Sequence, residues 1–117
     1  MIETYDIIHG FEDYDAAAET TAVYPDKGDN LIYPALGLVG EAGEIAEKVK
    51  KMIRDDASKL TEERRQALIK ELGDVLWYVS ALAREIGSSL NEVATQNIRK
   101  LYSRMNRDKL HGEGDNR

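Results

Sequence analysis

Two short stretches of the sequence each carry a pair of acidic residues around a glycine. The four acids are Glu41, Glu44, Glu71 and Asp74, and the glycines are Gly43 and Gly73. Carboxylate oxygens without nitrogen or sulfur ligands suit a hard cation such as Mg²⁺ or Mn²⁺, and such sites commonly hold substrate phosphates. If two helices bring the pairs together, the four carboxylates meet at one point. The spacing therefore predicts an oxygen-only metal site.

Either pair alone has a plainer explanation, because charged residues flank most helical seams. Glu44 and Lys48 form a good i,i+4 ion pair, worth about 0.2–0.5 kcal/mol. Asp74 has Tyr78 rather than a cation at position i+4, and Glu71 also lacks a cation there. Carboxylates beside an apolar stripe are costly unless they are paired or bind a metal. The second pair therefore favours the metal site over a solvated helix face.

The two glycines need a reason of their own. A glycine inside a helix costs about 1 kcal/mol relative to alanine. Gly43 and Gly73 each stand one position before the second acid of their pair. We expect them to let a facing backbone or a bulky ligand approach closely, with tight helix packing alone as the alternative.

Helical periodicity runs through most of the chain and predicts the elements that must position these acids. The expected helices span about residues 11–23, 34–54, 62–86 and 89–107. Thr61 is a candidate N-cap of the third helix, and "SLNE" is a capping box that places Ser89 at the start of the fourth. We expect an all-α, four-helix bundle-like fold and one domain over residues 1–117, with a polar tail from about residue 108.

Composition narrows the class of protein. The chain has 117 residues. Its net charge of −6 argues against nucleic-acid binding, and the lack of cysteine excludes disulfides and thiolate chemistry. With 42% hydrophobic residues the core is marginal for a lone monomer, so oligomerisation is expected. The sequence has no membrane-spanning stretch and no signal-peptide pattern, so a soluble cytoplasmic protein without a membrane partner is expected.

Four stretches together resemble the MazG-like nucleotide pyrophosphohydrolases of the all-α NTP pyrophosphatase superfamily. They are "LGLVGEAGEIAEKVKK", "KELGDVLWYVSALA", "SLNEVATQNIRKLYSR" and the closing "GEGDNR". The resemblance implies that Glu41, Glu44, Glu71 and Asp74 bind Mg²⁺, or Mn²⁺ in its place. It also implies hydrolysis of a nucleoside triphosphate to the monophosphate and pyrophosphate. Relatives of this kind are homodimers or homotetramers of helical hairpins, with sites near subunit contacts.

Several further residues are candidates for substrate contacts and proton transfer. Glu44 and Glu47 are the candidate acceptors of the proton from the attacking water. The resemblance points to the fourth helix for phosphate contacts, and Lys48 and Lys51 compete for that role. A base needs flat apolar surface, for which Trp77 and the pair Tyr33 and Leu36 are candidates. The substrate-binding candidates are Lys48, Lys51, Trp77, Tyr78, Asn97, Lys100 and Arg104.

The function expected from these residues is housecleaning of the nucleotide pool by Mg²⁺-dependent hydrolysis of NTPs or dNTPs. The sequence leaves two alternative functions open. One is the phosphoribosyl-ATP pyrophosphohydrolase of histidine biosynthesis, which belongs to the same superfamily. The other is a helical oligomer that acts as an adaptor or regulator without catalysis.

Overall fold

The computed structural model describes residues 7–107, which form four α-helices and no strand. Helix α1 spans Phe11–Glu19, α2 spans Ile32–Asp55, α3 spans Glu62–Glu85 and α4 spans Leu90–Asn106. The all-α class and the four predicted helices are therefore confirmed. The predicted polar tail lies outside the described residues, and the assignment of residues 1–117 to one domain stays a prediction.

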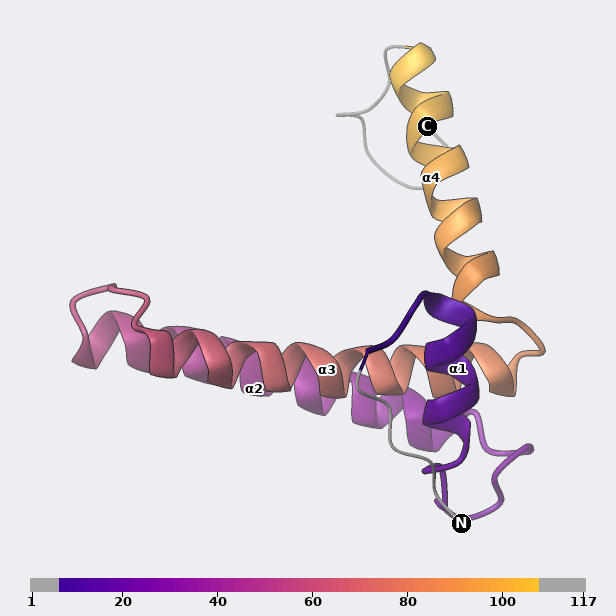
Figure 1. Cartoon of the computed structure of the whole chain (residues 1–117), viewed down its shortest axis with the longest axis horizontal. Helices are drawn as coiled ribbons and strands as arrows, with labels where there is room; N and C mark the ends of the chain where they lie inside the picture. The colour runs from indigo at the N-terminus through magenta and orange to yellow at the C-terminus, as the bar shows by residue number, and fades with distance from the viewer. Residues whose placement is uncertain (1–6, 108–117) are drawn as a thin grey trace.

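Helices α2 and α3 form a long hairpin, the main body of the molecule (Figure 1). The turn between them ends at Thr61, whose hydroxyl accepts a hydrogen bond from the backbone N–H of Arg64 at 3.2 Å. This is the predicted N-cap. The Arg64 side chain also forms an ion pair with Asp56 at the end of α2, so the two ends of the turn are joined.

Helix α1 ends at Glu19, four residues before the predicted end near Val23. The hydroxyls of Thr20 and Thr21 donate to the carbonyls of Ala17 and Ala18, both at 2.7 Å. Their backbone N–H groups bond to the same carbonyls, so the chain tightens to i→i+3 bonds. Threonine hydroxyls compete for backbone carbonyls in this way, which explains the early end of the helix.

One carboxylate joins three helices. Asp15 of α1 accepts hydrogen bonds from the hydroxyl of Ser80 in α3 at 2.5 Å and from the backbone N–H of Leu90 in α4 at 2.9 Å. Arg84 of α3 lies 3.7 Å from the same carboxylate. The Ser89 hydroxyl accepts from the backbone N–H of Glu92 at 3.1 Å, which confirms the predicted cap. From this junction α4 rises away from the hairpin (Figure 1).

The buried core within the described chain is small. Its apolar members are mostly short side chains, namely Ala18, Ala22, Tyr24, Ala81, Ala83 and Leu90. Large side chains remain exposed on α2, with Ile32 at 70%, Leu36 at 68% and Val39 at 71%. Leu72 of α3 is also exposed, because α2 covers only one side of that helix. No helix within residues 7–107 is long and apolar enough to cross a membrane.

Candidate metal and nucleotide site

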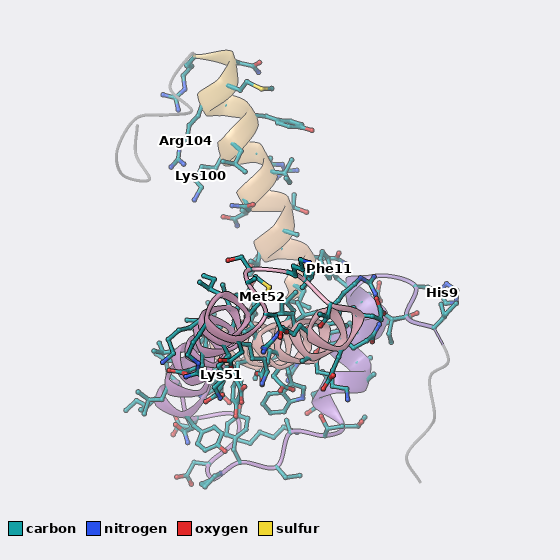
Figure 2. All side chains as sticks on the ribbon, turned by 90° about the vertical axis from the view of Figure 1, so that its left-hand side faces the viewer. His9, Phe11, Lys51, Met52, Lys100 and Arg104 are labelled. Atoms are coloured by element: carbon teal, nitrogen blue, oxygen red, sulfur yellow. The ribbon has the colours of Figure 1, made fainter. Side chains whose placement is uncertain are left out.

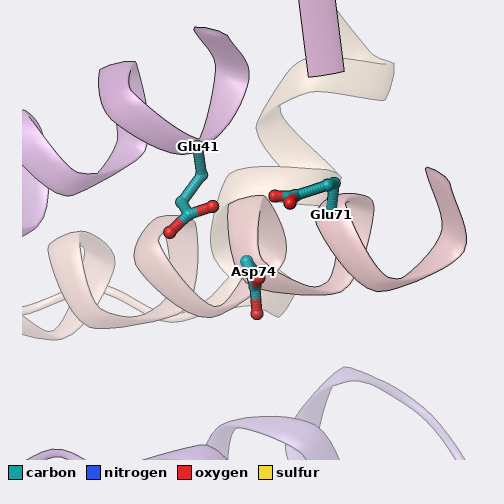
Figure 3. Close-up of side chains that lie close together, drawn as sticks. All are labelled: Glu41, Glu71 and Asp74. Atoms are coloured by element: carbon teal, nitrogen blue, oxygen red, sulfur yellow. The ribbon is translucent and has the colours of Figure 1, made fainter. Parts of the chain in front are cut away.

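Three of the four predicted acids meet between α2 and α3. Glu41 of α2 and Glu71 and Asp74 of α3 each offer one carboxylate oxygen, and these oxygens lie within 4.8 Å of one another. Figure 3 shows the side chains of Glu41 and Glu71 directed toward each other, with Asp74 beside them. Residues three apart on a helix lie on one face, so α3 presents two acids to the single acid of α2. We call these three residues the acidic cluster.

The acidic cluster is short of positive charge. The Glu71 side chain is only 14% exposed, and its Oε1 atom lies 3.4 Å from Nζ of Lys48 on α2. Glu71 thus has a cation partner after all, supplied across the hairpin rather than along α3. Its Oε2 atom is buried and finds no hydrogen-bond partner among residues 7–107. A buried acceptor without a partner fits a site built for a further cation.

The charges within the cluster also act on Glu41. The neighbouring Glu71 carboxyl group, first of all, raises the pKa of Glu41, and burial and the negative charge of Asp74 raise it further. Carboxylates this close repel one another, and a bound cation would relieve that repulsion. An all-oxygen set of this kind selects hard divalent ions.

The remaining predicted carboxylates lie outside the cluster. Glu44 is exposed and is close enough for its charge to contribute to the raised pKa of Glu41. Glu47 is exposed and forms an ion pair with Lys50 at 2.9 Å. The hydrogen bond from Lys50 lowers the pKa of Glu47, which makes it a weaker base. The roles of both residues as ligand or proton acceptor stay predictions.

A cleft of about 360 Å³ opens beside the acidic cluster. It is lined by Thr21, Glu41, Asp74, Trp77 and Tyr78. The two aromatic candidates of α3 therefore border the same space as two of the acids. The indole N–H of Trp77 donates to the Thr21 hydroxyl at 2.8 Å, which fixes one edge of the ring. Thr21 is not among the residues predicted from the sequence, because nothing in its local sequence pattern links it to α3.

Trp77 and Tyr78 belong to a group of four aromatic side chains, which we call the aromatic cluster. Tyr24 stacks on Tyr33 with ring centroids 5.0 Å apart, and Trp77 meets Tyr78 edge to face at 5.0 Å. Tyr24 lies 6.4 Å from Trp77, and Tyr33 lies 6.5 Å from Tyr78. Burial, followed by the neighbouring Tyr33, raises the pKa of Tyr78. The candidate Leu36 is exposed and does not line the cleft.

A glycine does make a close approach possible here, although it is not one of the two that the sequence singled out. A Cβ atom at Gly37 of α2 would lie 2.6 Å from Cδ1 of Tyr78 and still closer to two other ring atoms. Gly43 and Gly73 have no such neighbour within 4 Å. The expected approach of a facing backbone at these two positions is therefore wrong within the described chain. Gly37 is the position that lets the Tyr78 ring rest against α2.

The predicted cations fall into two groups. Lys48 and Lys51 line a cleft of about 340 Å³ near the turn of the hairpin, and Arg64 borders it too. Asn97 and Lys100 line a separate cleft of about 530 Å³ along α4. Figure 2 shows Lys100 and Arg104 on α4, well away from Lys51 on the hairpin, and Arg104 is buried. One copy of the chain therefore brings Lys48 to the acidic cluster but not the α4 residues.

Comparison with known proteins gives a similar phage protein and a matching family. Over 109 residues the chain is 50% identical to the Gene 37 protein of Mycobacterium phage L5, covering 89% of this chain and 96% of that protein. No solved structure matches the chain. Residues 34–107, which hold the acidic cluster, Trp77, Tyr78 and α4, match the MazG nucleotide pyrophosphohydrolase domain. The chain belongs to the MazG nucleotide pyrophosphohydrolase family.

Proposed function

We propose that this protein hydrolyses nucleoside triphosphates, NTPs or dNTPs, to the monophosphate and pyrophosphate in a Mg²⁺-dependent reaction. The role that we propose for this reaction is housecleaning of the nucleotide pool. One observation carries the proposal: three carboxylates meet beside a cleft walled by Trp77 and Tyr78. A metal site next to aromatic surface can take both ends of a nucleotide, because the ion attracts phosphates and the rings attract a base.

The residues of the acidic cluster fit the proposed ion. Glu41, Glu71 and Asp74 would hold Mg²⁺, or Mn²⁺ in its place, and Glu44 is the proposed fourth ligand. The unpartnered Oε2 atom of Glu71 supports this assignment. When bound, a divalent ion supplies the positive charge that lets a polyanionic substrate approach carboxylates, and it polarises the phosphoryl oxygens.

The side chains around the cluster then have separate tasks. Trp77 and Tyr78 would bind the base, and Lys48 and Lys51 would attract phosphate oxygens that extend toward the hairpin turn. A carboxylate must accept the proton of the attacking water, and Glu44 and Glu47 are the candidates. We favour Glu44, because Glu47 is held in an ion pair with Lys50.

We further propose that the protein acts as a homodimer or homotetramer. The exposed Ile32, Leu36 and Val39 support this proposal, because their spacing places them on one face of α2 and contiguous exposed apolar surface often marks a contact between proteins. A second copy could bring Asn97, Lys100 and Arg104 of its own α4 toward the hairpin. That arrangement would reconcile the family resemblance with the distance between α4 and the acidic cluster in one chain.

The test is pyrophosphate release from a panel of NTPs and dNTPs over a Mg²⁺ titration. The wild-type protein is compared with Glu41→Gln and Glu71→Gln, and with Glu62→Gln as the control, because Glu62 is an exposed acid on α3 outside the cluster. We expect both cluster variants to lose at least about a hundredfold in turnover while the control keeps it. Orthophosphate as the product would refute the proposed cleavage. Turnover of phosphoribosyl-ATP alone would favour the biosynthetic relative, and no turnover of any nucleotide would favour an adaptor.

A further inference from the structure

Glu85, the last residue of α3, accepts three hydrogen bonds from the segment that joins α1 to α2. The Tyr24 hydroxyl and the backbone N–H of Gly28 donate to its Oε2 atom, the latter at 2.8 Å. The backbone N–H of Asn30 donates to its Oε1 atom at 2.9 Å. Both oxygens are therefore used as acceptors, and these bonds, that of Tyr24 first, lower the pKa of Glu85. No step of the proposed reaction needs this carboxylate.

The segment held by Glu85 runs from Tyr24 to Asn30, and we call it the α1–α2 loop. Within it, the Asn30 side chain donates to the carbonyl of Pro25 at 2.8 Å and accepts from the backbone N–H of Tyr33 at 3.0 Å. Asn30 therefore ties the loop to the first turn of α2. Gly28 has a φ of 96°, which a residue with a side chain rarely adopts, so it favours the turn that directs its N–H to Glu85.

The same contacts lead from Glu85 to the cleft beside the acidic cluster, which we call the nucleotide cleft after its proposed function. Tyr24 is buried, and its ring stacks on Tyr33 and meets the edge of Trp77. Tyr33 and Trp77 in turn both contact Tyr78. Trp77 and Tyr78 border the cleft beside Glu41 and Asp74, whereas Glu85 does not line it. The carboxylate thus sits at the far end of a continuous series of ring contacts.

We propose that Glu85 is the positioning residue of the nucleotide cleft, which it serves by holding Tyr24 and the α1–α2 loop so that the aromatic cluster forms its wall. The kinetic part of this inference rests on the proposed function, whereas the structural part does not. Glu85 touches neither the substrate nor the acidic cluster. Its loss should therefore weaken nucleotide binding and leave metal binding and the chemical step in place.

The first test reads the aromatic cluster without substrate. Trp77 is the single tryptophan, so its fluorescence reports on the cluster alone. Glu85→Gln puts an N–H₂ group where one of two acceptors stood, so at least one loop bond is lost. We expect a red-shifted Trp77 emission, stronger quenching by acrylamide and loss of near-UV circular dichroism. The matched control is Glu19→Gln, which removes a carboxylate that is paired with Lys27 of the same loop at 2.5 Å. We expect its spectra to equal those of the wild type.

The second test uses nucleotide turnover. For Glu85→Gln we expect KM to rise about tenfold with kcat within about twofold, because a base–aromatic contact is lost while the reacting groups stay in place. The Mg²⁺ activation curve should not move. Tyr24→Phe removes one donor to Glu85 and keeps the ring, so its KM should rise less. The double variant should match Glu85→Gln alone, since both changes act through one contact.

The outcomes separate the two proposals. Wild-type spectra for Glu85→Gln overturn the positioning role, whether or not the protein hydrolyses nucleotides. Altered spectra with unchanged KM overturn it too, as does an equal fall of kcat in Glu85→Gln and Glu19→Gln, which would indicate general destabilisation. If the wild type hydrolyses no nucleotide, the proposed function fails. The spectra of the wild type, Glu85→Gln and Glu19→Gln would still decide whether Glu85 holds the aromatic cluster.

Discussion

Replacing Gly37 by alanine should displace Tyr78 from the nucleotide cleft. The new Cβ atom would lie 2.6 Å from Cδ1 of Tyr78 and nearer still to two other ring atoms. Carbon atoms in ordinary contact stay about 3.5–4.0 Å apart, so the ring must retreat by about 1 Å or more. Tyr78 borders the cleft together with Glu41 and Asp74, and its displacement therefore changes the wall of the cleft.

The expected effect on stability follows from two opposing terms. Overpacking of this kind costs about 1–3 kcal/mol. Alanine recovers about 1 kcal/mol of the helix propensity that glycine loses. Gly37→Ala should therefore lower the free energy of unfolding by about 0–2 kcal/mol, measured by urea unfolding followed by Trp77 fluorescence. The value of kcat/KM should fall by about tenfold to a hundredfold, because a displacement of about 1 Å in a catalytic site can have that effect.

The matched controls are Gly43→Ala and Gly73→Ala. Both positions lie in helix interiors and have no neighbour within 4 Å for the new Cβ atom. Each should raise the free energy of unfolding by about 0.5–1 kcal/mol. If Gly37→Ala were as stable and as active as these controls, the contact between Tyr78 and α2 would have no role. If a control lost activity while gaining stability, a ligand would need the open space that its glycine leaves.

Three further predictions concern the surrounding polar contacts. Asp15→Ala removes the acceptor of the Leu90 N–H and should lower the free energy of unfolding, measured with urea, by about 1–3 kcal/mol. A change near zero would show that the junction of α1, α3 and α4 needs no carboxylate. Lys48→Met removes the cation of the acidic cluster, so it should destabilise the metal-free protein slightly and increase the rise in Tm on adding Mg²⁺. Equal rises in Tm for the wild type and the variant would contradict this. The pH dependence of unfolding should show two limits. The hydrogen bonds from Tyr24, Asn30 and Gly28 lower the pKa of Glu85, so its contribution to stability is lost as the pH falls below the ordinary carboxyl range. Burial, and then the bond to Glu85, raises the pKa of Tyr24 from 10.0 to about 12, so its contribution is lost as the pH rises between these values. Glu85→Gln should flatten the acid limit.

Local signals account for what the sequence predicted well. Thr61 and Ser89 were recognised as caps because a cap depends on residues three positions away. Glu71 and Asp74 were placed together because helical periodicity alone fixes their relation. Their meeting with Glu41 is different, because it depends on how α2 and α3 are set against each other. The paired motifs pointed to it without giving that alignment.

Long-range contacts account for what the sequence did not reveal. Lys48 compensates Glu71 across the hairpin, and Tyr24 bonds to Glu85 at a separation of 61 residues. No periodic pattern marks such pairs. The glycines show the same limit, because Gly37 and Gly43 look alike in the sequence and only the facing helix decides which one has a ring against it. The early end of α1 arose from side-chain hydroxyls that competed with the helix.

Because α4 is held at its first residue by Asp15, a small rotation there would move its far end by a larger distance. Helix α4 has 17 residues and is therefore about 25 Å long at about 1.5 Å per residue. It leaves the body of the protein from one end, where a single carboxylate binds its first N–H group. A rotation of about 10° at that end would carry the far end through about 4 Å. Small changes in the packing of α1 against α3 would thus be magnified along α4, which makes the base of this helix a sensitive point for adjusting the position of Lys100.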